Sequence, residues 1–349
     1  MNLEFIEALE EIEEEKGISK DVIFDALESA LISSYKKNFG SSQNVEVEID
    51  RTTGKVKVLA KKIVVEEVEN ELFEISIDEA RSINNKYQID DTVNIEITPK
   101  NFGRIAAQTA KQVVIQRIKD AERDVIYDEF INRENEIITG MVQRISKNHV
   151  YIDLGKTEGV LPPTEQIEGE VYEQGDRIKL YILEVKKTTK GPQIILSRSH
   201  PGLVKRLFEL EVPEIQEGVV DIYAISREAG SRTKIAVYSK DENVDPVGAC
   251  VGFKGARVKA LVEELNGEKI DIIIWNKNPE EFIANSLSPS KVISVKINEK
   301  EKSAIVVVPD YQLSLAIGKE GQNARLAAKL TNWKIDIKPE SQYNEENLL

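Results

Sequence analysis

The chain contains a single cysteine and only two histidines among its 349 residues. One cysteine cannot form an intrachain disulfide, and three such side chains are too few for a structural zinc site, which needs four ligands. No run of about eighteen apolar residues occurs, and the first residues lack the basic and apolar segments of a secretory signal. We therefore expect a cytoplasmic protein from a reducing compartment, with no bound metal and no membrane partner.

Catalytic motifs are also missing. The sequence has no phosphate-binding P-loop, no H-E-x-x-H zinc motif and no G-x-S-x-G nucleophile elbow. We expect no catalytic residue, no cofactor and no enzymatic activity, and we interpret Cys250 as a core thiol because it lies in an apolar segment. Aromatic residues make up only 6% of a chain that is long enough for two to four domains, which favours several small modules over one large enzyme core.

Charge is unevenly distributed along the chain. The net charge is −14, and residues 1–30 carry ten acidic side chains against two lysines. Residues 311–338 carry five basic side chains and two acidic ones. Such asymmetry indicates different partners at the two ends, although an acidic amphipathic helix can also be a merely solvated face.

Residues 1–130 predict one α+β domain. Apolar residues at helical spacing indicate two helices, over residues 3–16 and 20–40. An alternating hairpin follows over residues 45–59, and residues 63–68 and 93–97 extend the sheet. A long helix over residues 104–130 closes the domain.

Residues 131–200 predict a five-stranded barrel of the OB type. Five short strands follow one another at intervals of about ten residues, and closure would remove their exposed edges. Barrels of this type bind single strands with basic and aromatic side chains on one face. The candidate RNA-binding residues here are Lys147, His149, Tyr151 and Arg198.

An internal repeat occupies residues 201–276 and 277–339. Each unit has the predicted order helix, strand, strand, helix, helix, strand, and in each a G-x-x-G loop separates the two adjacent helices. The loops lie 66 residues apart, and Lys-Ile-Asp recurs at 269–271 and 334–336. Trp275 and Trp333, at equivalent ends of the last strands, are interpreted as packing residues. The polar residues 340–349 predict a disordered tail.

The repeated loops suit a phosphodiester backbone. Glycine has no Cβ, so a phosphate can approach the chain, and the N–H groups that open the next helix can face it. This is the KH arrangement, in which each loop holds about four nucleotides of single strand. A lone G-x-x-G is more often a structural helix–turn–helix corner, and the functional interpretation rests on the two matching copies. The candidate RNA-binding residues are Gly252, Phe253, Lys254, Gly255, Arg257 and Lys259 in the first unit, and Gly318, Lys319, Glu320, Gly321, Asn323 and Arg325 in the second.

Two stretches carry a resemblance to a known family. Residues 98–113, TPKNFGRIAAQTAKQV, look like the N-terminal signature of the NusA family of bacterial transcription elongation factors. Residues 318–327, GKEGQNARLA, are similar to the second KH loop of that family. The order of the parts resembles the family over essentially the whole chain.

The resemblance implies a multidomain α+β protein with an N-terminal polymerase-binding domain, an S-one-type barrel and two type II KH domains of order αββααβ. It implies that residues 1–130 bind core RNA polymerase near the RNA exit channel and that the other domains receive nascent single-stranded RNA. Members prolong pausing, favour hairpin-dependent termination and join antitermination complexes with other Nus-type factors. We expect a monomer. Val150 and Pro162 stand where an aromatic residue and a histidine often line the RNA face of such barrels.

Two other functions stay open from the sequence. A KH protein of the ribosome or of mRNA could bind RNA without contacting polymerase. Exoribonucleases can also carry KH and S-one-type modules, but in the reverse order, and 130 residues cannot hold their duplicated phosphorolytic core.

Overall fold

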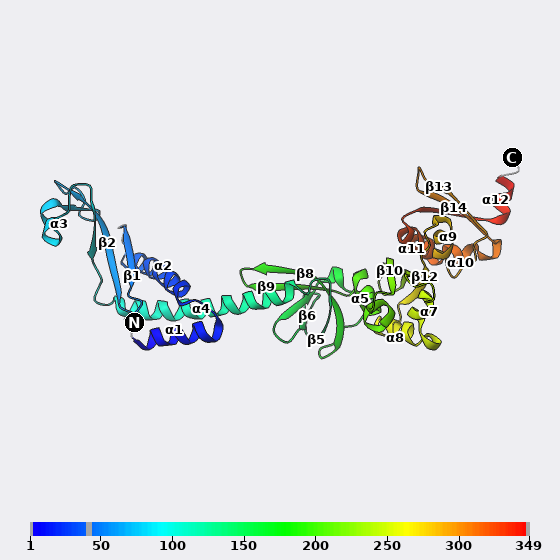
Figure 1. Ribbon diagram of the computed structural model, residues 1–349, viewed down its shortest axis with the longest axis horizontal. Coiled ribbons are helices and arrows are strands. Elements are labelled where there is room, and N and C mark those ends of the chain that lie inside the picture. The colour runs from blue at the N-terminus through cyan, green and yellow to red at the C-terminus, as the bar shows by residue number, and fades with distance from the viewer. Residues whose placement is uncertain (1–2, 40–43, 347–349) are drawn as a thin grey trace. The chain divides into compact units, whose positions relative to one another are not determined.

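The computed structural model describes residues 3–39 and 44–346, and the chain divides into two compact units, residues 1–125 and 126–349 (Figure 1). The expected end of the second helix at Gly40 falls outside the described residues. No helix in these two ranges combines the length and the apolar character needed to cross a bilayer.

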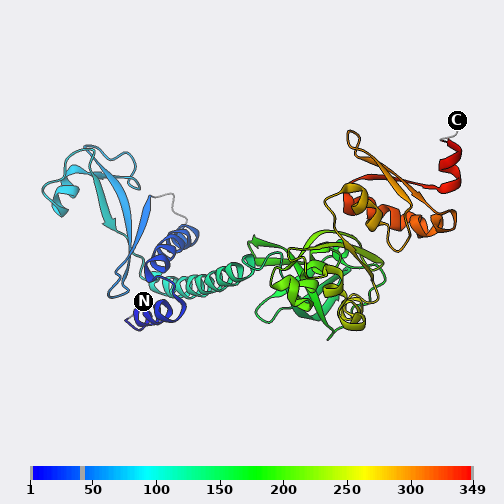
Figure 2. The same ribbon diagram turned by 45° about the vertical axis from the view of Figure 1, so that its right-hand side comes forward.

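Three long helices lie in the first unit wholly or in large part: α1 (Leu3–Lys16), α2 (Lys20–Phe39) and α4 (Phe102–Ile131). Helices α1 and α2 lie on opposite sides of α4 (Figures 1 and 2). Leu9 of α1, Leu27 of α2 and Phe102 of α4 are buried in one shared core. The apolar residues at helical spacing thus meet around α4, as the amphipathic pattern predicts.

The sheet of the first unit is built around one long strand. Strand β2 (Val56–Val65) pairs with β1 (Val45–Ile49) and β4 (Thr92–Glu96) antiparallel, and with β3 (Glu74–Ser76) parallel. The sequence pattern predicted separate strands over 55–59 and 63–68. The structure instead continues the strand, because Ala60 and Val64 are both buried and residues 59–63 pair without a break along β4.

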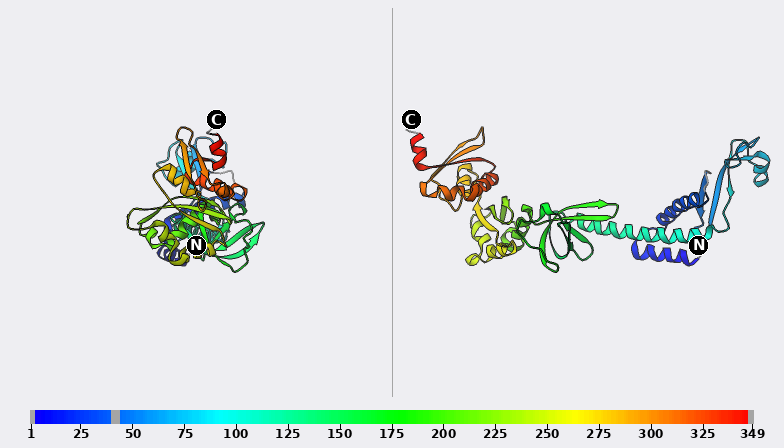
Figure 3. Two further views of the ribbon diagram at one scale, coloured as in Figure 1. Left: turned by 90° about the vertical axis from the view of Figure 1, so that its right-hand side faces the viewer. Right: turned by 180° about the vertical axis from the view of Figure 1, so that it is seen from behind.

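A short helix that was not predicted from the sequence packs against this sheet. Helix α3 (Ile77–Ile83) begins at Ser76, whose hydroxyl accepts a hydrogen bond from the Glu79 amide. Ala80 packs with Val64 and Val93 in a second small core. This part of the unit lies away from α1 and α2 (Figure 3).

The second unit begins with a closed barrel, which confirms the predicted five-stranded fold. Strands β5 (Ile137–Ser146), β6 (His149–Asp153), β7 (Glu158–Leu161), β8 (Arg177–Thr188) and β9 (Gly191–Ser197) close in the order β5-β6-β7-β9-β8. A single 3-10 turn, η1 (Pro163–Glu165), follows β7. Phe130, which the sequence analysis assigned to the first domain, packs into the barrel core because the last turns of α4 belong to the second unit.

Two units of order αββααβ follow, as the repeat predicts. The first contains α5 (Pro201–Glu211), the short α6 (Pro213–Gln216), β10 (Val220–Glu228), β11 (Arg232–Ser239), α7 (Pro246–Val251), α8 (Ala256–Glu264) and β12 (Lys269–Ile274). The second contains α9 (Pro279–Ser286), β13 (Ser294–Asn298), β14 (Ser303–Val308), α10 (Leu313–Ile317), α11 (Gln322–Thr331) and β15 (Lys334–Pro339). In each sheet the first two strands are antiparallel and the last is parallel to the second. We call these units KH1 and KH2.

Residues 340–346 correct the prediction of a disordered tail. They form helix α12 (Glu340–Glu346), which contacts β14 and β15 (Figure 1). The carboxylate of Asp310 accepts hydrogen bonds from the amide and the hydroxyl of Ser341, each 3.1 Å long. A tertiary contact therefore orders a segment whose composition alone favours disorder.

The KH1 core contains a fully buried ion pair. Glu268 accepts hydrogen bonds of 2.9 Å from the Arg227 guanidinium and from the Gly230 amide, and neither side chain of the pair is more than 1% exposed. Burial alone would raise the pKa of Glu268, but these hydrogen bonds outweigh it and hold the pKa below its ordinary value. The ionised carboxylate therefore stabilises KH1 at neutral pH, and this contribution is lost as the pH falls through the folded-state pKa.

We predict that Glu268→Gln lowers the free energy of unfolding by about 3–5 kcal/mol, because it leaves the buried guanidinium without a counterion. Trp275 and Trp333 are the only tryptophans of the chain, so their fluorescence during urea unfolding reports on KH1 and KH2. The matched control is Glu263→Gln on α8, where the glutamate is exposed. Equal unfolding midpoints for the two variants would contradict this role of the pair.

Candidate nucleic-acid interface

The two glycine loops have the same backbone geometry. In KH1, Gly252 has φ 72° and ψ 175°, Lys254 has φ 50° and Gly255 has φ 78°. In KH2, Gly318 has φ 77° and ψ 171°, Glu320 has φ 53° and Gly321 has φ 75°. Three residues of each loop therefore have positive φ angles, which glycine adopts without steric cost.

The first glycine of each loop is also required by close packing. A Cβ atom at position 252 would lie 2.7 Å from Cγ of Arg257, and one at position 318 would lie 2.8 Å from the backbone nitrogen of Asn323. The loop thus folds tightly against the helix that follows it. Glycine at these positions is needed for the loop's own shape, independently of any ligand.

The helices that follow the loops begin without a side-chain cap. Gly255 and Gly321 are the N-cap residues of α8 and α11, and no side chain accepts a hydrogen bond from the first amides of either helix. By contrast, Asp245 caps α7 by accepting from the amides of Val247 and Gly248. The first amide of each helix donates to a carbonyl of its own loop, that of Ala256 to Phe253 and that of Gln322 to Lys319. An anion at either helix N-terminus would be met by the amides that follow, which the helix dipole also favours.

The KH1 loop presents cations and an aromatic ring to solvent. Phe253 is 83% exposed, and Nζ of Lys254 lies 5.3 Å from the centroid of its ring. Lys254 and Lys259 are exposed and form no ion pair within the described residues. These side chains combine charge for a phosphate with a flat surface for a base.

The KH2 loop has less free positive charge. Lys319 and Glu320 are both exposed. Nε of Arg325 donates a 2.8 Å hydrogen bond to the carboxylate of Glu228 in KH1. Arg325 also donates to the Glu320 carbonyl at 2.8 Å. The hydrogen bond to Glu228 raises the pKa of Arg325, and the same bond lowers the pKa of Glu228.

The guanidinium of Arg257 in KH1 also forms hydrogen bonds within the protein. Its guanidinium donates to the Glu214 carboxylate at 2.9 Å and to the Ala249 carbonyl at 2.6 Å. These bonds connect α8 to α6 and to the end of α7. Arg257 therefore shapes the loop, and about a quarter of its side chain stays accessible.

Two predicted RNA-binding residues are buried, and for both the prediction is wrong. Asn323 is 2% exposed, and its amide group donates 3.0 Å bonds to the carbonyls of Leu287 and Ala316. Arg198 is 1% exposed and pairs with the buried Glu170, while it also donates to the Lys179 and Glu264 carbonyls. Asn323 joins α11 to α9 and α10, and Arg198 joins the barrel to KH1.

The other barrel candidates lie on or beside one hairpin. Lys147 occupies the turn with φ 49°, and Nδ1 of His149 lies 3.0 Å from its carbonyl oxygen. The ring of Tyr151 is covered by the guanidinium of Arg144, 3.5 Å from the ring centroid, and Arg144 also pairs with Glu158. Sequence analysis missed Arg144, although the hairpin register places it directly opposite Tyr151.

Cys250 and the two tryptophans have structural positions. Cys250 is fully buried, and burial raises the pKa of its thiol to about 12, so it carries no reactive thiolate at neutral pH. Trp275 stacks on Tyr223, and Trp333 packs against the KH2 core. Within residues 3–39 and 44–346, no cluster of three or more histidine, cysteine or acidic side chains could hold a metal ion.

Comparisons with known proteins cover the chain nearly end to end. Four family models match: the NusA N-terminal domain over residues 4–124, the S1 RNA binding domain over 132–199, the NusA-like first KH domain over 198–275 and the NusA-like second KH domain over 279–345. A solved structure of the N-terminal domain of NusA from Bacillus subtilis is 56% identical and covers 35% of this chain and 99% of that one, with a TM-score of 0.33.

Full-length relatives agree with these matches. The transcription termination/antitermination protein NusA of Halalkalibacterium halodurans is 61% identical over all of this chain and 91% of its own length. The protein of the same name from Bacillus subtilis is 60% identical over 99% of this chain and 93% of its own length. With such identity over almost the whole length of both chains, this chain belongs to the NusA family of transcription termination/antitermination proteins.

Proposed function

We propose that this chain is a transcription elongation factor that binds RNA polymerase with its first unit and nascent single-stranded RNA with its second. In this role it modulates pausing, hairpin-dependent termination and antitermination. It acts in the cytoplasm as a non-enzymatic monomer, near the RNA exit channel, together with other Nus-type factors. The names of its relatives support the link to transcription and do not favour an RNA-binding role without polymerase.

The observation that carries the RNA-binding part is the pair of matching loops, each followed by a helix without a side-chain cap. A phosphate at each loop would meet the N-terminal end of α8 or α11, with Lys254 and Lys259 nearby in KH1 and Lys319 in KH2. Gly252, Gly255, Gly318 and Gly321 keep the backbone accessible to the strand, and Phe253 offers a face to a base. Arg257, Glu320 and Arg325 set the shape of the loops, so the KH1 loop supplies more of the charge attraction.

The barrel hairpin supplies a second RNA contact. The stacked Tyr151 and Arg144 form a flat surface, and Lys147 and His149 lie at the turn beside it. Stacking of a base on such a surface contributes about 1–3 kcal/mol and tolerates any base. This contact extends the path of the strand beyond the KH pair.

The polymerase-binding part rests on the first unit. Its first thirty residues carry most of the net negative charge of the chain, and an acidic helical face complements a basic protein surface. Both lysines of this region form ion pairs, Lys16 with Glu122 and Lys20 with Glu10.

We predict that Lys254→Asp weakens binding of single-stranded RNA and shortens pauses without unfolding KH1, because the residue is exposed. If the two loops make about five phosphate contacts, the log–log slope of affinity against salt is near −3.5, and losing one contact reduces it by about 0.7. Lys300→Asp in the exposed β13–β14 turn is the matched control, since it changes the net charge equally. Equal slopes for the two variants would contradict a phosphate contact at Lys254.

We predict the opposite effect for Glu320→Lys. Position 320 in KH2 corresponds to Lys254 in KH1, and the two residues have φ values of 53° and 50°. A lysine therefore fits the backbone there, removes a repulsive carboxylate and adds a phosphate contact. RNA affinity should rise, and the salt slope should steepen by about 0.7. An unchanged or weaker affinity would show that RNA does not approach this loop.

We predict that residues 126–349 alone retain RNA binding and lose binding to core RNA polymerase. Truncation after Val125 keeps Phe130 in the barrel core, whereas truncation after residue 130 would remove it. Capture of core polymerase on the immobilised full chain and on the truncated chain measures the difference. Equal capture by both would place the polymerase contact in the second unit and contradict the assignment.

A further inference from the structure

Each glycine loop has a basic side chain beside its second glycine. In KH1 this is Lys259, whose Cε lies 3.8 Å from the point that a Cβ atom of Gly255 would occupy. In KH2 it is Arg325, whose Nη1 lies 3.8 Å from the corresponding point of Gly321. Both residues follow the second glycine by four positions, on the helix that leaves the loop. A cation in this place can contact a phosphate that approaches the loop.

The two equivalent cations differ in what they contact. Lys259 is exposed and forms no ion pair among the residues that the structure describes. Arg325 binds Glu228 of KH1 in a bidentate manner, with Nε donating to Oε1 at 2.8 Å and Nη2 donating to Oε2 at 3.2 Å. Arginine binds phosphate through the same two parallel hydrogen bonds. Glu228 therefore occupies the edge of the guanidinium that a phosphate would use.

Further contacts with KH2 hold the Glu228 carboxylate in this position. Nε2 of Gln322, the first residue of α11, donates to Oε2 of Glu228 at 2.9 Å and to Oγ of Ser231 at 2.7 Å. The hydrogen bond from Arg325 is the main cause that lowers the pKa of Glu228, and Gln322 adds to it, so the carboxylate is ionised at neutral pH. A negative charge from KH1 thus lies beside the first turn of α11, where the helix dipole attracts an anion.

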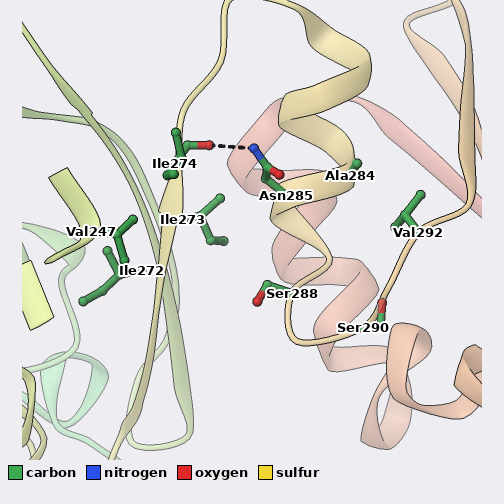
Figure 4. Close-up of a pocket in the computed structure, with 9 residues that line it drawn as sticks. All are labelled: Val247, Ile272, Ile273, Ile274, Ala284, Asn285, Ser288, Ser290 and Val292. Atoms are coloured by element: carbon green, nitrogen blue, oxygen red, sulfur yellow. Dashed lines mark hydrogen bonds between the residues drawn. The ribbon is translucent and has the colours of Figure 1, made fainter. Parts of the chain in front are cut away.

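The contact between KH1 and KH2 does not rest on Glu228 alone. Nδ2 of Asn285 in α9 donates to the Ile274 carbonyl of β12 at 3.3 Å, as Figure 4 shows. The buried Nζ of Lys234 in KH1 donates to the Ser288 carbonyl of KH2 at 2.7 Å. These bonds hold KH2 on KH1 without Glu228, so the carboxylate can be altered while the two domains stay together.

We propose that Glu228 masks Arg325 and thereby limits the affinity of the KH2 loop for RNA, an inference that rests on the proposed RNA-binding function. Lys259 is available to a phosphate in KH1, whereas its counterpart in KH2 is bound by a carboxylate of the neighbouring domain. The KH2 loop then receives the strand without the charge of this arginine. A transcript that grows has to move through the loops, and a weaker contact at KH2 lets the strand dissociate from that loop faster.

The test uses the full chain and a single-stranded RNA selected from a random pool by binding to it. Glu228→Gln keeps the shape of the side chain and removes the charge that holds Arg325. RNA affinity should rise about fivefold at about 0.1 M salt, and the log–log salt slope should steepen by about 0.7, because one phosphate contact is added. Glu299→Gln in the exposed β13–β14 turn of KH2 is the charge-matched control and should change the affinity less than about twofold.

The same substitution in an Arg325→Gln chain separates masking from general repulsion of RNA by a carboxylate. If Glu228 acts by masking, Glu228→Gln raises affinity less than about twofold when the arginine is absent. Equal rises with and without Arg325 would overturn the inference, and so would an unchanged affinity of Glu228→Gln while Lys254→Asp still weakens binding. If Lys254→Asp and Glu228→Gln both leave RNA affinity unchanged, the proposed RNA-binding function fails together with it.

Discussion

The buried ammonium group of Lys234 fixes the placement of KH1 against KH2. Its Nζ donates to the Asp271 carboxylate at 3.0 Å and to the Ser288 carbonyl of KH2 at 2.7 Å. Burial lowers the pKa of Lys234, against the attraction of Asp271. A charge in such a position needs all of its partners, so KH2 cannot rotate away without leaving polar groups unpaired. An apolar contact of Ile273, Phe282 and Leu330 reinforces this arrangement.

A fixed KH pair binds RNA differently from two domains on a flexible linker. Once one loop holds the strand, the other meets it at a high effective concentration, but only if the strand follows the path that the domains define. The fixed arrangement also has a disadvantage for KH2. Arg325 donates a hydrogen bond to Glu228 of KH1, so its guanidinium is not free to contact a phosphate. In the proposed function KH2 therefore contributes defined geometry, while the free lysines of KH1 contribute charge.

The repeat and its loops could be predicted from sequence because their causes are local. Positive φ angles and a close approach to the next helix require glycine at fixed positions, so the pattern is visible in both copies. The roles of Arg198 and Asn323 could not be predicted in this way. Whether these side chains are exposed depends on Glu170 and Leu287, which lie 28 and 36 residues away in the sequence. Helix α12 depends likewise on Asp310, so its polar composition alone predicted disorder.

Arg144 was not predicted, but the sequence contains a pattern from which its position could have been predicted. The turn at Lys147 and Asn148 fixes the register of the β5–β6 hairpin, and counting outward from that turn places Arg144 opposite Tyr151. Cross-strand neighbours are the unit of interaction in a sheet, so a stacked pair follows from register alone. The residues of a single strand do not show this pairing of Arg144 with Tyr151. Residues compared in pairs across the hairpin do show it.

The net charge of −14 does not oppose RNA binding, because the phosphate responds to local charge. At physiological ionic strength, exposed charges farther apart than about 8 Å are largely screened. The KH1 loop and the first turn of α8 carry the exposed lysines Lys254 and Lys259, and the N-terminal end of α8 adds partial positive charge. A chain that is acidic elsewhere has little general affinity for nucleic acid, which confines binding to the loops. If the loops hold the backbone of an unpaired strand, as proposed, the acidic remainder of the chain increases discrimination against duplex.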